Sequence, residues 1–442
     1  KTMPEFNKYL ARCTYLLERG KPVSDILWYL GDEVNHKPDQ KIEFKGFKYD
    51  YCNPDVLLNR LTIRKDGTNA ILTTPEGLTY RILYIPDNER MLPETVEKIV
   101  EFKKAGVPVV GTPPKNIATL VGGETAKQRF DKAVAEWKES GVVLRLEDAL
   151  KQLQPDVIGD VLWTHRKIDG ADWYFVCSPR GQEFNGTLQF RNVGNIEIWD
   201  AVTGKVTPSA AVVNDGQTND EQTNDSQTSV PLNLPKAGSC FVVFRHDKSG
   251  TNNASLLAKA LVPTPTPTQI NGTWTLSFPE GWGTPKTLEI AELKAWKDLE
   301  LSPEGKAFSG SVTYTTVFDA GEVKQGDRYE LDLGRVDMIA AVTLNGKPLQ
   351  TLWASPYKLD VTEAIQNGKN TLKVDVTSTW FNRLVYDANQ PEEKRKTWTI
   401  RGPNKNAPLR ESGLLGPVHL IKLTQGLDNP IPKKTTRHSI TP

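Results

Sequence analysis

Residues 333–384 read LGRVDMIAAVTLNGKPLQTLWASPYKLDVTEAIQNGKNTLKVDVTSTWFNRL, and this stretch decides the fold of the last third of the chain. The run 336–344 is rich in β-branched and apolar residues and ends at Asn345-Gly346. Apolar runs on both sides of Asn-Gly predict a hairpin, because both turn positions need a positive φ. A second Asn-Gly at 367–368 precedes the run 371–376, in which apolar and polar residues alternate. The pattern predicts one side of an antiparallel β-sandwich.

Length and composition set the scale of the architecture around this stretch. A chain of 442 residues exceeds one ordinary hydrophobic core, so two to four domains are expected. The 55 Lys and Arg balance 54 Asp and Glu, which indicates neither a nucleic-acid partner nor an anionic membrane. No apolar run approaches the ~20 residues that a membrane span needs. The chain begins at Lys1 without a signal-like stretch, and we interpret it as a piece of a longer protein.

Helical and strand patterns alternate through residues 1–155. An expected helix at 93–105 has proline at its first turn, and short apolar strands are expected at 24–30 and 107–110. Such alternation indicates a mainly parallel sheet with helices on its faces. About four strands are visible, whereas a closed barrel needs about eight. We therefore predict an open α/β domain.

The character of the chain changes after residue 155. Residues 156–262 carry short strands separated by turns, which predict a small β-sandwich domain. The stretch 214–229 has no large apolar residue and is expected to be a loop within it. Residues 263–268, PTPTPT, predict an extended linker. The β-sandwich at 269–425 and a polar tail at 426–442 follow.

Cysteine and histidine spacing shows no metal or redox motif. Cys177 and Cys240 fall in expected strands of one domain, where they either form a disulfide or act as small buried side chains, as Cys13 and Cys52 do. The five histidines are scattered and are interpreted as surface or turn residues. We therefore predict no metal, no cofactor and no nucleophile elbow of the G-x-S-x-G type.

Aromatic and polar residues at the end of the opening stretch form the candidate binding site. Sugar rings stack on aromatic faces, while amides, acids and arginine bind their hydroxyl groups. The mixture is found within eight residues, and the predicted carbohydrate-binding residues are Trp380, Asn382, Arg383 and Asp387. The competing interpretation is that the tryptophans fill a core or a domain interface.

A second polar and aromatic cluster enters an expected helix near residue 53. Its members, predicted to line a pocket, are Asp50, Tyr51 and Asn53, and Asn53 is alternatively the helix N-cap. Glycoside hydrolysis needs two carboxylates ~5–10 Å apart on rigid elements. The acids Glu392, Glu393 and Glu411 fall in charged or loop-like segments. We interpret them as a solvated face and assign no catalytic residue.

Several segments together resemble one family. Residues 333–376 resemble the galactose-binding-like, or sugar-binding-like, jelly-roll sandwich of family 2 glycoside hydrolases. TSTWFNRLVYDANQ at 377–390 and ESGLLGPVHL at 411–420 are similar to the C-terminal half of α-L-rhamnosidases of glycoside hydrolase family 106. YLARCTYLLERGKPVSDILWYLG, GLTYRILYIPD and LWTHRKIDGADWYFVCS resemble the amidotransferase-like α/β domain and the β-domain that follow the barrel in those enzymes.

This resemblance implies a function for the chain. The family hydrolyses terminal α-L-rhamnose with acidic residues and a calcium ion on an N-terminal barrel, which this chain lacks. The chain is then the accessory post-barrel half of a rhamnosidase-like hydrolase acting on rhamnose-containing plant-type polysaccharide, inactive alone, and periplasmic or secreted. Its expected partners are a carbohydrate and the barrel, in the same polypeptide or operon. The alternatives are a free-standing carbohydrate-binding protein and an independent α/β enzyme built on residues 1–155.

Overall fold

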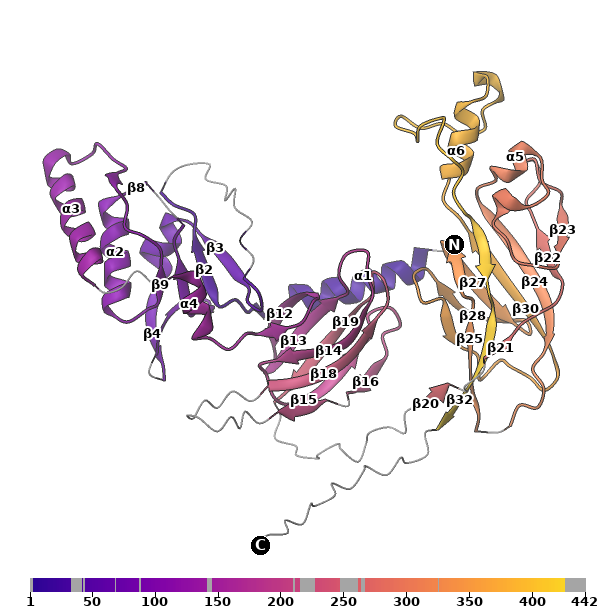
Figure 1. Cartoon of the computed structure of the whole chain (residues 1–442), viewed down its shortest axis with the longest axis horizontal. Coiled ribbons are helices and arrows are strands. Elements are labelled where there is room, and N and C mark those ends of the chain that lie inside the picture. Colours follow the sequence, from indigo (N-terminus) through magenta and orange to yellow (C-terminus); the bar gives the residue numbers. More distant parts are fainter. Residues whose placement is uncertain are drawn as a thin grey trace, which may run out of the picture. The chain divides into compact units, whose positions relative to one another are not determined.

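Two units make up the chain in the computed structural model, which describes residues 3–32, 42, 44–67, 69–86, 89–140, 145–209, 211–214, 227–246, 261–263, 267–324 and 326–425. The N-terminal unit is Arg12–Ala254, and the C-terminal unit combines Lys1–Ala11 with Ser255–Pro442. Figure 1 shows the elements of both units coloured along the chain. Each unit is described by itself.

A four-stranded parallel sheet is the centre of the α/β part of the N-terminal unit (Figure 1). All its pairings are parallel, in the order β3 (Tyr49–Cys52), β2 (Ile26–Tyr29), β7 (Ile82–Tyr84) and β9 (Val109–Val110). The central strand β2 is buried along its whole length, because both of its faces are covered. Leu27 and Tyr29 pack into one hydrophobic cluster, and Ile26 and Trp28 into another. The prediction of an open parallel sheet of about four strands is confirmed.

Helices supply the cover on both faces of this sheet. Their bounds are α2 (Pro93–Lys104), α3 (Gly123–Glu139) and α4 (Leu146–Lys151). Phe102 of α2 and Trp137 of α3 are buried in the cluster that contains Leu27, and Ala149 of α4 is buried with Trp28. Two smaller sheets complete this part: β4 (Thr62–Asp66), β5 (Asn69–Thr73) and β6 (Thr79–Tyr80), and the pair β8 (Arg90–Met91) with β10 (Asn116–Ile117). The apolar run at 142–144 also predicts a strand, and these residues lie outside the described residues.

The rest of the N-terminal unit is a β-sandwich. One sheet has the order β1 (Lys21–Pro22), β12 (Leu162–Ile168), β13 (Ala171–Cys177), β19 (Ser239–Arg245), β15 (Asn195–Trp199) and β16 (Val206–Pro208). The other has the order β11 (Val157–Ile158), β14 (Phe184–Phe190), β18 (Gln227–Leu234) and β17 (Val212–Asn214). Their facing sides share one core that includes Tyr174, Phe190 and Phe244. Of the predicted loop 214–229, the end at Gln227 belongs to β18, and residues 215–226 lie outside the described residues.

The cysteines of this unit carry thiols and form no disulfide in the structure. Burial raises the pKa of Cys240 and of Cys52 to about 12, and that of Cys177 to about 11. Because the thiolate is the reactive form, the raised pKa values disfavour these three side chains as nucleophiles; Cys52 and Cys240 are buried and Cys177 is partly buried.

The C-terminal unit is a larger antiparallel sandwich. Its six-stranded sheet has the order β23 (Thr287–Ile290), β22 (Trp274–Ser277), β24 (Ser311–Asp319), β30 (Lys369–Thr377), β27 (Ile339–Leu344) and β28 (Lys347–Leu352). The opposite sheet contains β20 (Leu261–Pro263), β32 (His419–Gln425), β25 (Arg328–Asp332) and β29 (Lys358–Asp360), and β21 (Thr268–Gln269) also pairs with β32. Short pieces β26 (Arg335–Asp337) and β31 (Gly413–Gly416) pair beside them. The core is shared by Tyr314, Val374 and Leu420, which come from both sheets.

The opening stretch folds as the hairpin that its sequence predicts. Asn345 and Gly346 have φ of 53° and 79° between β27 and β28. The expected single strand 336–344 is divided into β26 and β27, because its first residues pair with β31 instead of β30. Both ends of the predicted linker, Pro263 and Thr268, belong to strands that pair with β32, and residues 264–266 lie outside the described residues.

The first helix also contributes to this unit. Within α1 (Met3–Glu18), Phe6 and Tyr9 lie against the indole of Trp353, with ring centroids 5.1 and 5.0 Å from it. These contacts join the start of the chain to a unit whose remaining residues begin at Ser255. The C-terminal unit is therefore discontinuous in sequence.

Candidate functional site

The predicted carbohydrate-binding residues surround α6 (Phe381–Ala388), which follows β30 in the C-terminal unit. Trp380 precedes the helix and is 46% exposed, whereas Asn382, Arg383 and Asp387 are 2%, 1% and 1% exposed. The four residues are thus close along one short helix, but three of them lie beneath the surface. Trp380 is the member that a ligand in solution reaches directly.

Arg383 is the centre of a buried ionic cluster. Its guanidinium donates from Nε to Asp387 Oδ2 at 3.0 Å and from Nη1 to Glu304 Oε1 at 3.0 Å. Burial alone would lower the pKa of Arg383, but its hydrogen bonds to these two carboxylates outweigh burial and raise the pKa. The guanidinium carbon also lies 5.2 Å from the ring centroid of Trp282. The cation therefore orients an aromatic side chain as well as two acids.

Asp387 holds the segment that follows α6. Besides Arg383, its Oδ2 accepts hydrogen bonds from Lys396 N at 3.1 Å and from Thr397 N and Oγ1, both at 2.7 Å. Lys396 continues to Glu304 Oε1 at 2.7 Å, and its ammonium lies 5.7 Å from the Trp282 ring centroid. A single buried carboxylate thus fixes two consecutive residues of the loop.

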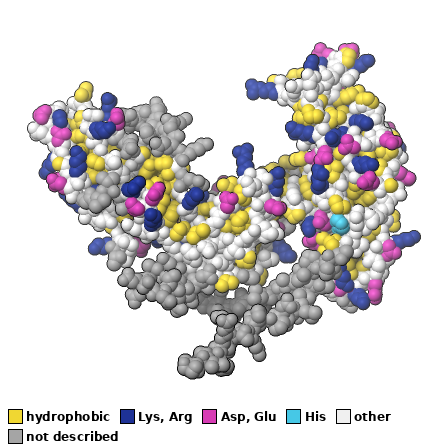
Figure 2. Space-filling model, viewed as in Figure 1, with side chains coloured by type: hydrophobic (Ala, Val, Ile, Leu, Met, Phe, Trp, Pro, Cys, Tyr) yellow, Lys and Arg dark blue, Asp and Glu magenta, His cyan; other side chains and the backbone are white. Residues whose placement is uncertain are grey.

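Aromatic side chains are exposed directly beside these anchors. Trp282 and Trp380 lie with ring centroids 5.6 Å apart, and Trp398 is 79% exposed. Figure 2 shows hydrophobic side chains and Lys or Arg side chains together at the end of the unit where Figure 1 places α6. In contrast, Trp274 and Trp296 are buried in the sandwich core. The tryptophans therefore divide between the core and the surface at α6.

The second predicted cluster, at residues 50–53, does not converge on one pocket. Asp50 and Tyr51 are neighbours in β3, so their side chains point to opposite faces of the sheet. Asp50 accepts a hydrogen bond from Tyr80 at 3.0 Å, while Tyr51 packs 5.6 Å from Trp28 and is half exposed. Asn53 Oδ1 accepts from Val56 N at 3.0 Å and acts as a helix cap.

At the carboxyl edge of the parallel sheet, the described acid and thiol make structural contacts. Asp32, after β2, accepts hydrogen bonds from Tyr29 at 2.5 Å, from Thr95 at 2.7 Å and from the backbone N–H of Leu92 at 2.8 Å. The thiol at this edge, Cys52, is buried and protonated. Ligands of open α/β sheets bind at this edge, and the acid and thiol found there are committed to packing. Among the described residues of this edge, Asp32 and Cys52 therefore serve as structural contacts.

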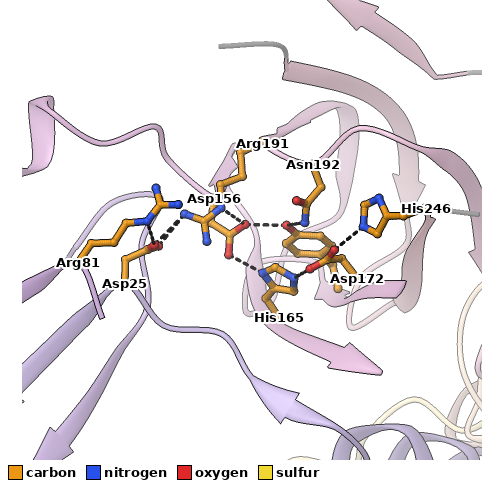
Figure 3. Close-up of polar contacts among 9 residues, drawn as sticks. Asp25, Arg81, Asp156, His165, Asp172, Arg191, Asn192 and His246 are labelled. Atoms are coloured by element: carbon orange, nitrogen blue, oxygen red, sulfur yellow. Dashed lines mark hydrogen bonds and ion pairs between the residues drawn. The ribbon is translucent and has the colours of Figure 1, made fainter. Parts of the chain in front are cut away.

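A buried ionic network, which the sequence did not reveal, lies within the N-terminal unit (Figure 3). His165 of β12 is 1% exposed; its Nδ1 lies 2.8 Å from Asp156 Oδ2 and its Nε2 2.6 Å from Asp172 Oδ1. Asp156 Oδ1 accepts from Tyr174 at 2.6 Å and lies 3.2 Å from Arg191 Nε. The prediction that each histidine lies at the surface or in a turn is wrong for His165.

The network continues from the sandwich to the α/β part. Arg191 Nη1 donates to both carboxylate oxygens of Asp25, at 2.8 and 2.9 Å, and Arg81 lies 3.8 Å from Asp25 (Figure 3). On the other side, His246 Nε2 lies 2.5 Å from Asp172 Oδ2. Ion pairs thus run without interruption from the start of β2 to the end of β19.

Opposite charges decide the protonation of this network. Burial alone would lower the pKa of His165, but Asp156 and Asp172 outweigh it and raise the pKa. Burial would raise the pKa of Asp172, but its hydrogen bonds to His165 and His246 lower it to about 2. His165 is therefore a buried cation between two buried carboxylates. The arrangement leaves no free lone pair for proton transfer to a substrate, and its role is structural.

In the C-terminal unit, Asp337 is an acid whose pKa is raised, in contrast to the lowered pKa of Asp172. Burial, and then the charge of Glu411, raise its pKa, although Ser412 and Arg410 act in the other direction. Glu411 itself is ion-paired to Arg335. The described residues contain no group of three or more His, Cys, Asp or Glu placed to hold a metal ion.

Comparison with known proteins identifies the class first. Residues 305–412 match the family model of the galactose-binding-like domain of family 2 glycoside hydrolases, so the C-terminal unit contains a galactose-binding-like sandwich of glycoside hydrolase type. Residues 2–211 match the glycoside hydrolase family 106 model, described as alpha-L-rhamnosidase. The chain therefore combines a family 106 region with a family 2 galactose-binding-like domain, and it is rhamnosidase-related.

A solved structure extends this match over nearly the whole chain. The rhamnosidase from Novosphingobium sp. PP1Y is 28% identical, covers 95% of the chain with a TM-score of 0.78, and is itself covered to 41%. A Formosa agariphila protein with the provisional name beta-glucuronidase is 22% identical over 95% of the chain and 57% of its own length. The chain thus spans about half the length of these relatives.

Weaker likeness is confined to part of the chain. A beta-glucuronidase of an uncultured Clostridium is 21% identical over 37% of the chain and 30% of its own length, with a TM-score of 0.29, which is too low to carry an argument. None of the helices in the described part of the chain combines the length and the apolar character of a membrane-spanning segment.

Proposed function

We propose that this chain is the accessory portion of a rhamnosidase-like glycoside hydrolase that acts on rhamnose-containing plant-type polysaccharide. The observation that carries the proposal is the match to the Novosphingobium rhamnosidase, which includes 95% of this chain but 41% of that enzyme. The larger part of that enzyme has no counterpart in this chain. The catalytic barrel is then a separate segment, in the same polypeptide or operon, and is the expected partner.

The state of the acids supports an accessory role. Asp25, Asp156 and Asp172 are buried in ion pairs, and Glu304 is paired with Arg383 and Lys396. Glycoside hydrolysis requires one carboxylate free to attack or to activate water and one acid free to donate a proton. Acids held in ion pairs supply neither, so these four carboxylates serve as structural contacts, which supports an accessory role. For the whole assembly we propose a periplasmic or secreted location, as its polymeric substrate requires.

A glycosidase assay tests the accessory role. Purified residues 1–442 are incubated with an aryl α-L-rhamnoside and, in parallel, with an aryl β-glucuronide, because both activities are named among the relatives. The expected result is no release of the aryl group from either substrate. Release of the aryl group by this chain alone would show that it holds its own catalytic site. The gene and operon upstream of the codon for Lys1 are the second measurement: a barrel, usually ~250 residues, is expected in the same reading frame or in a neighbouring gene.

A free-standing carbohydrate-binding protein is the second candidate function. The specific observation in its favour is the exposed aromatic group at α6, where Trp380 and Trp398 lie beside the ionic cluster of Arg383. Affinity electrophoresis of the full chain in gels containing a rhamnose-rich polysaccharide tests it. Retarded migration supports the candidate, and unchanged migration at all polysaccharide concentrations removes it.

A further inference from the structure

The segment after α6, residues 389–411, is called the α6 loop here, and it is anchored at several points. Asp387 fixes residues 396 and 397, as described above. Asn382 Oδ1 accepts from Arg410 N at 2.8 Å, and its Nδ2 donates to Arg410 O at 2.9 Å. Asn389 Nδ2 donates to Lys405 O at 2.7 Å. Because side chains on and next to a rigid helix hold both ends and the middle, the loop is preorganised.

The tip of this anchored loop exposes large apolar side chains. Trp398 is 79% and Ile400 is 85% exposed, and Thr399 and Arg401 around them are exposed as well. Trp398 directly follows Thr397, which is held by Asp387. An aromatic side chain with few rotatable bonds on a fixed backbone loses little conformational entropy when a ligand binds. These are the properties of a binding loop.

The charge of the α6 loop selects the kind of ligand. The loop carries six Lys or Arg and three Glu, whereas the whole chain is balanced to within one charge. Among the described residues, no carboxylate lies within ion-pair distance of four exposed cations, which are Lys394, Arg395, Arg401 and Lys405. Among the described residues, Glu392 and Glu393 of the loop likewise have no Lys or Arg within ion-pair distance. The excess of unpaired cations favours an anionic ligand.

We propose that the α6 loop binds an anionic glycan, one whose sugar units carry carboxylates, with Trp398 and Trp380 stacking on the sugar rings and Arg401 and Lys405 pairing with the carboxylates. This inference rests on the carbohydrate-binding candidate and names its ligand class. Stacking on tryptophan uses the C–H face of a pyranose ring, and guanidinium binds carboxylate with two parallel hydrogen bonds. A neutral glycan uses the first contact and not the second.

The test uses the full chain and two polymers that share one backbone and differ at their carboxyl groups. Polygalacturonate is titrated by isothermal calorimetry at low and at 0.5 M salt, beside the same polymer with its carboxylates methyl-esterified. Binding to polygalacturonate is expected to be at least ~10-fold tighter at low salt, and this preference should shrink at high salt, because exposed charges are screened. Trp398→Ala is expected to weaken binding roughly 5- to 10-fold with both polymers.

Charge variants and controls separate the two contacts. The double variant Arg401→Gln, Lys405→Gln should lose the preference for polygalacturonate and keep the affinity for the esterified polymer. The matched controls are Lys132→Gln, on α3 of the other unit, and Tyr15→Ala, both exposed, and neither should change binding. A circular-dichroism melting curve of each variant checks that the fold is intact.

Several outcomes would overturn the inference. Equal affinity for the charged and the esterified polymer shows that the loop selects no charge, while leaving the carbohydrate-binding candidate in place. Affinity that is unchanged in Trp398→Ala shows that binding takes place elsewhere. Tighter binding to single-stranded DNA than to polygalacturonate shows a general polyanion surface. None of these results bears on the accessory role, which depends on the glycosidase assay.

Discussion

Replacing His165 with phenylalanine removes the cation from the buried network of the N-terminal unit and keeps the shape of the side chain. The imidazole is stacked on Tyr174, with ring centroids 4.0 Å apart and planes 21° apart, so a phenyl ring fits the same space. What the variant loses is the pair of contacts to Asp156 and Asp172. Two carboxylates that are 1% and 4% exposed are left without their common partner.

The structure sets the size of the effect. A hydrogen bond to a charged group contributes about 1.5–3 kcal/mol, and removing one partner of a buried ion pair costs about 3–5 kcal/mol. Asp156 retains Arg191 and Tyr174, and Asp172 retains His246, which places the expected loss near the lower end. We expect the free energy of unfolding of the N-terminal unit to fall by about 3 kcal/mol. For a unit of this size the melting temperature then falls by roughly 6–12 °C.

Urea-induced unfolding of the full chain measures this loss, with the C-terminal unit as an internal standard. The transition of the N-terminal unit is expected to move to lower urea concentration, and that of the C-terminal unit to stay in place. His246→Gln is the matched control, because its side chain is 39% exposed and the glutamine amide keeps a donor for Asp172, so a loss of at most ~1 kcal/mol is expected. A second variant, His165→Phe with Asp172→Asn, should recover part of the loss by removing one unpaired charge.

The pH dependence gives an independent reading of the same network. His165 has a raised pKa, so its stabilisation is complete below the usual histidine value of ~6.5 and is lost as the pH rises through the higher folded value. Asp172 has a pKa lowered to about 2, so its stabilisation is complete above ~3.9 and is lost as the pH falls toward 2. The wild-type unit should be most stable between these limits, and His165→Phe should lack the alkaline decline. A loss below ~1 kcal/mol, or an unchanged alkaline slope, would refute the structural role of this cation.

Three further changes probe the C-terminal unit. Tyr314→Phe should destabilise it by about 1–3 kcal/mol in urea unfolding, because the buried N–H groups of Trp296 and Leu414 lose their acceptor; a loss equal to that of the exposed variant Tyr15→Phe contradicts this. Asp387→Asn should speed tryptic cleavage of the α6 loop at least ~10-fold, since a buried ion pair is broken; an unchanged digestion rate would mean that the loop is held by other contacts. Asp337→Asn should flatten the decline in stability between pH 4 and 7, because the raised pKa of Asp337 means that ionising it destabilises the fold; an identical pH profile would count against that assignment.

Local signals were sufficient for much of the fold. The turn at Asn345-Gly346 needs only two residues that adopt positive φ, and the structure has both. The buried strand Ile26–Tyr29 is apolar on both faces because the sheet is covered on both sides, and a continuous apolar run expresses this directly. Features that depend on neighbours in sequence were therefore predictable.

The buried network depends on distant segments, and the sequence shows its members as isolated polar residues. Asp25, Asp156 and Arg191 are far apart in the chain and meet only after folding. One clue was available: the turn Asp169-Gly170 sets the register of β12 and β13, which places His165 opposite Tyr174. When a hairpin strand directs a histidine side chain into a hydrophobic core, the buried ring needs a hydrogen-bond partner.

The cluster at residues 50–53 shows a different limit. The predicted pocket equates closeness along the chain with closeness in space, whereas Asp50 and Tyr51 lie in a strand whose side chains alternate between faces. At α6, in contrast, the helical period brings residues that are close along the chain close together in space. Asn382, Arg383 and Asp387 belong to one helix, and their mixture of amide, cation and acid serves as anchors beneath the surface. Composition alone does not distinguish a ligand contact from a support.

Phe6 and Tyr9 can pack against Trp353 only after the ribosome has made residue 353. The partners are separated by more than 340 residues, and a ribosome adds ~5–20 residues per second, so the first helix waits roughly 20–70 s for its indole to be made. During that interval a chaperone or a non-native contact has access to its aromatic side chains. A gene fragment beginning at residue 255 would also leave Trp353 without either ring. Anyone expressing the sandwich separately therefore needs to fuse the first helix to it, for example through a circularly permuted gene.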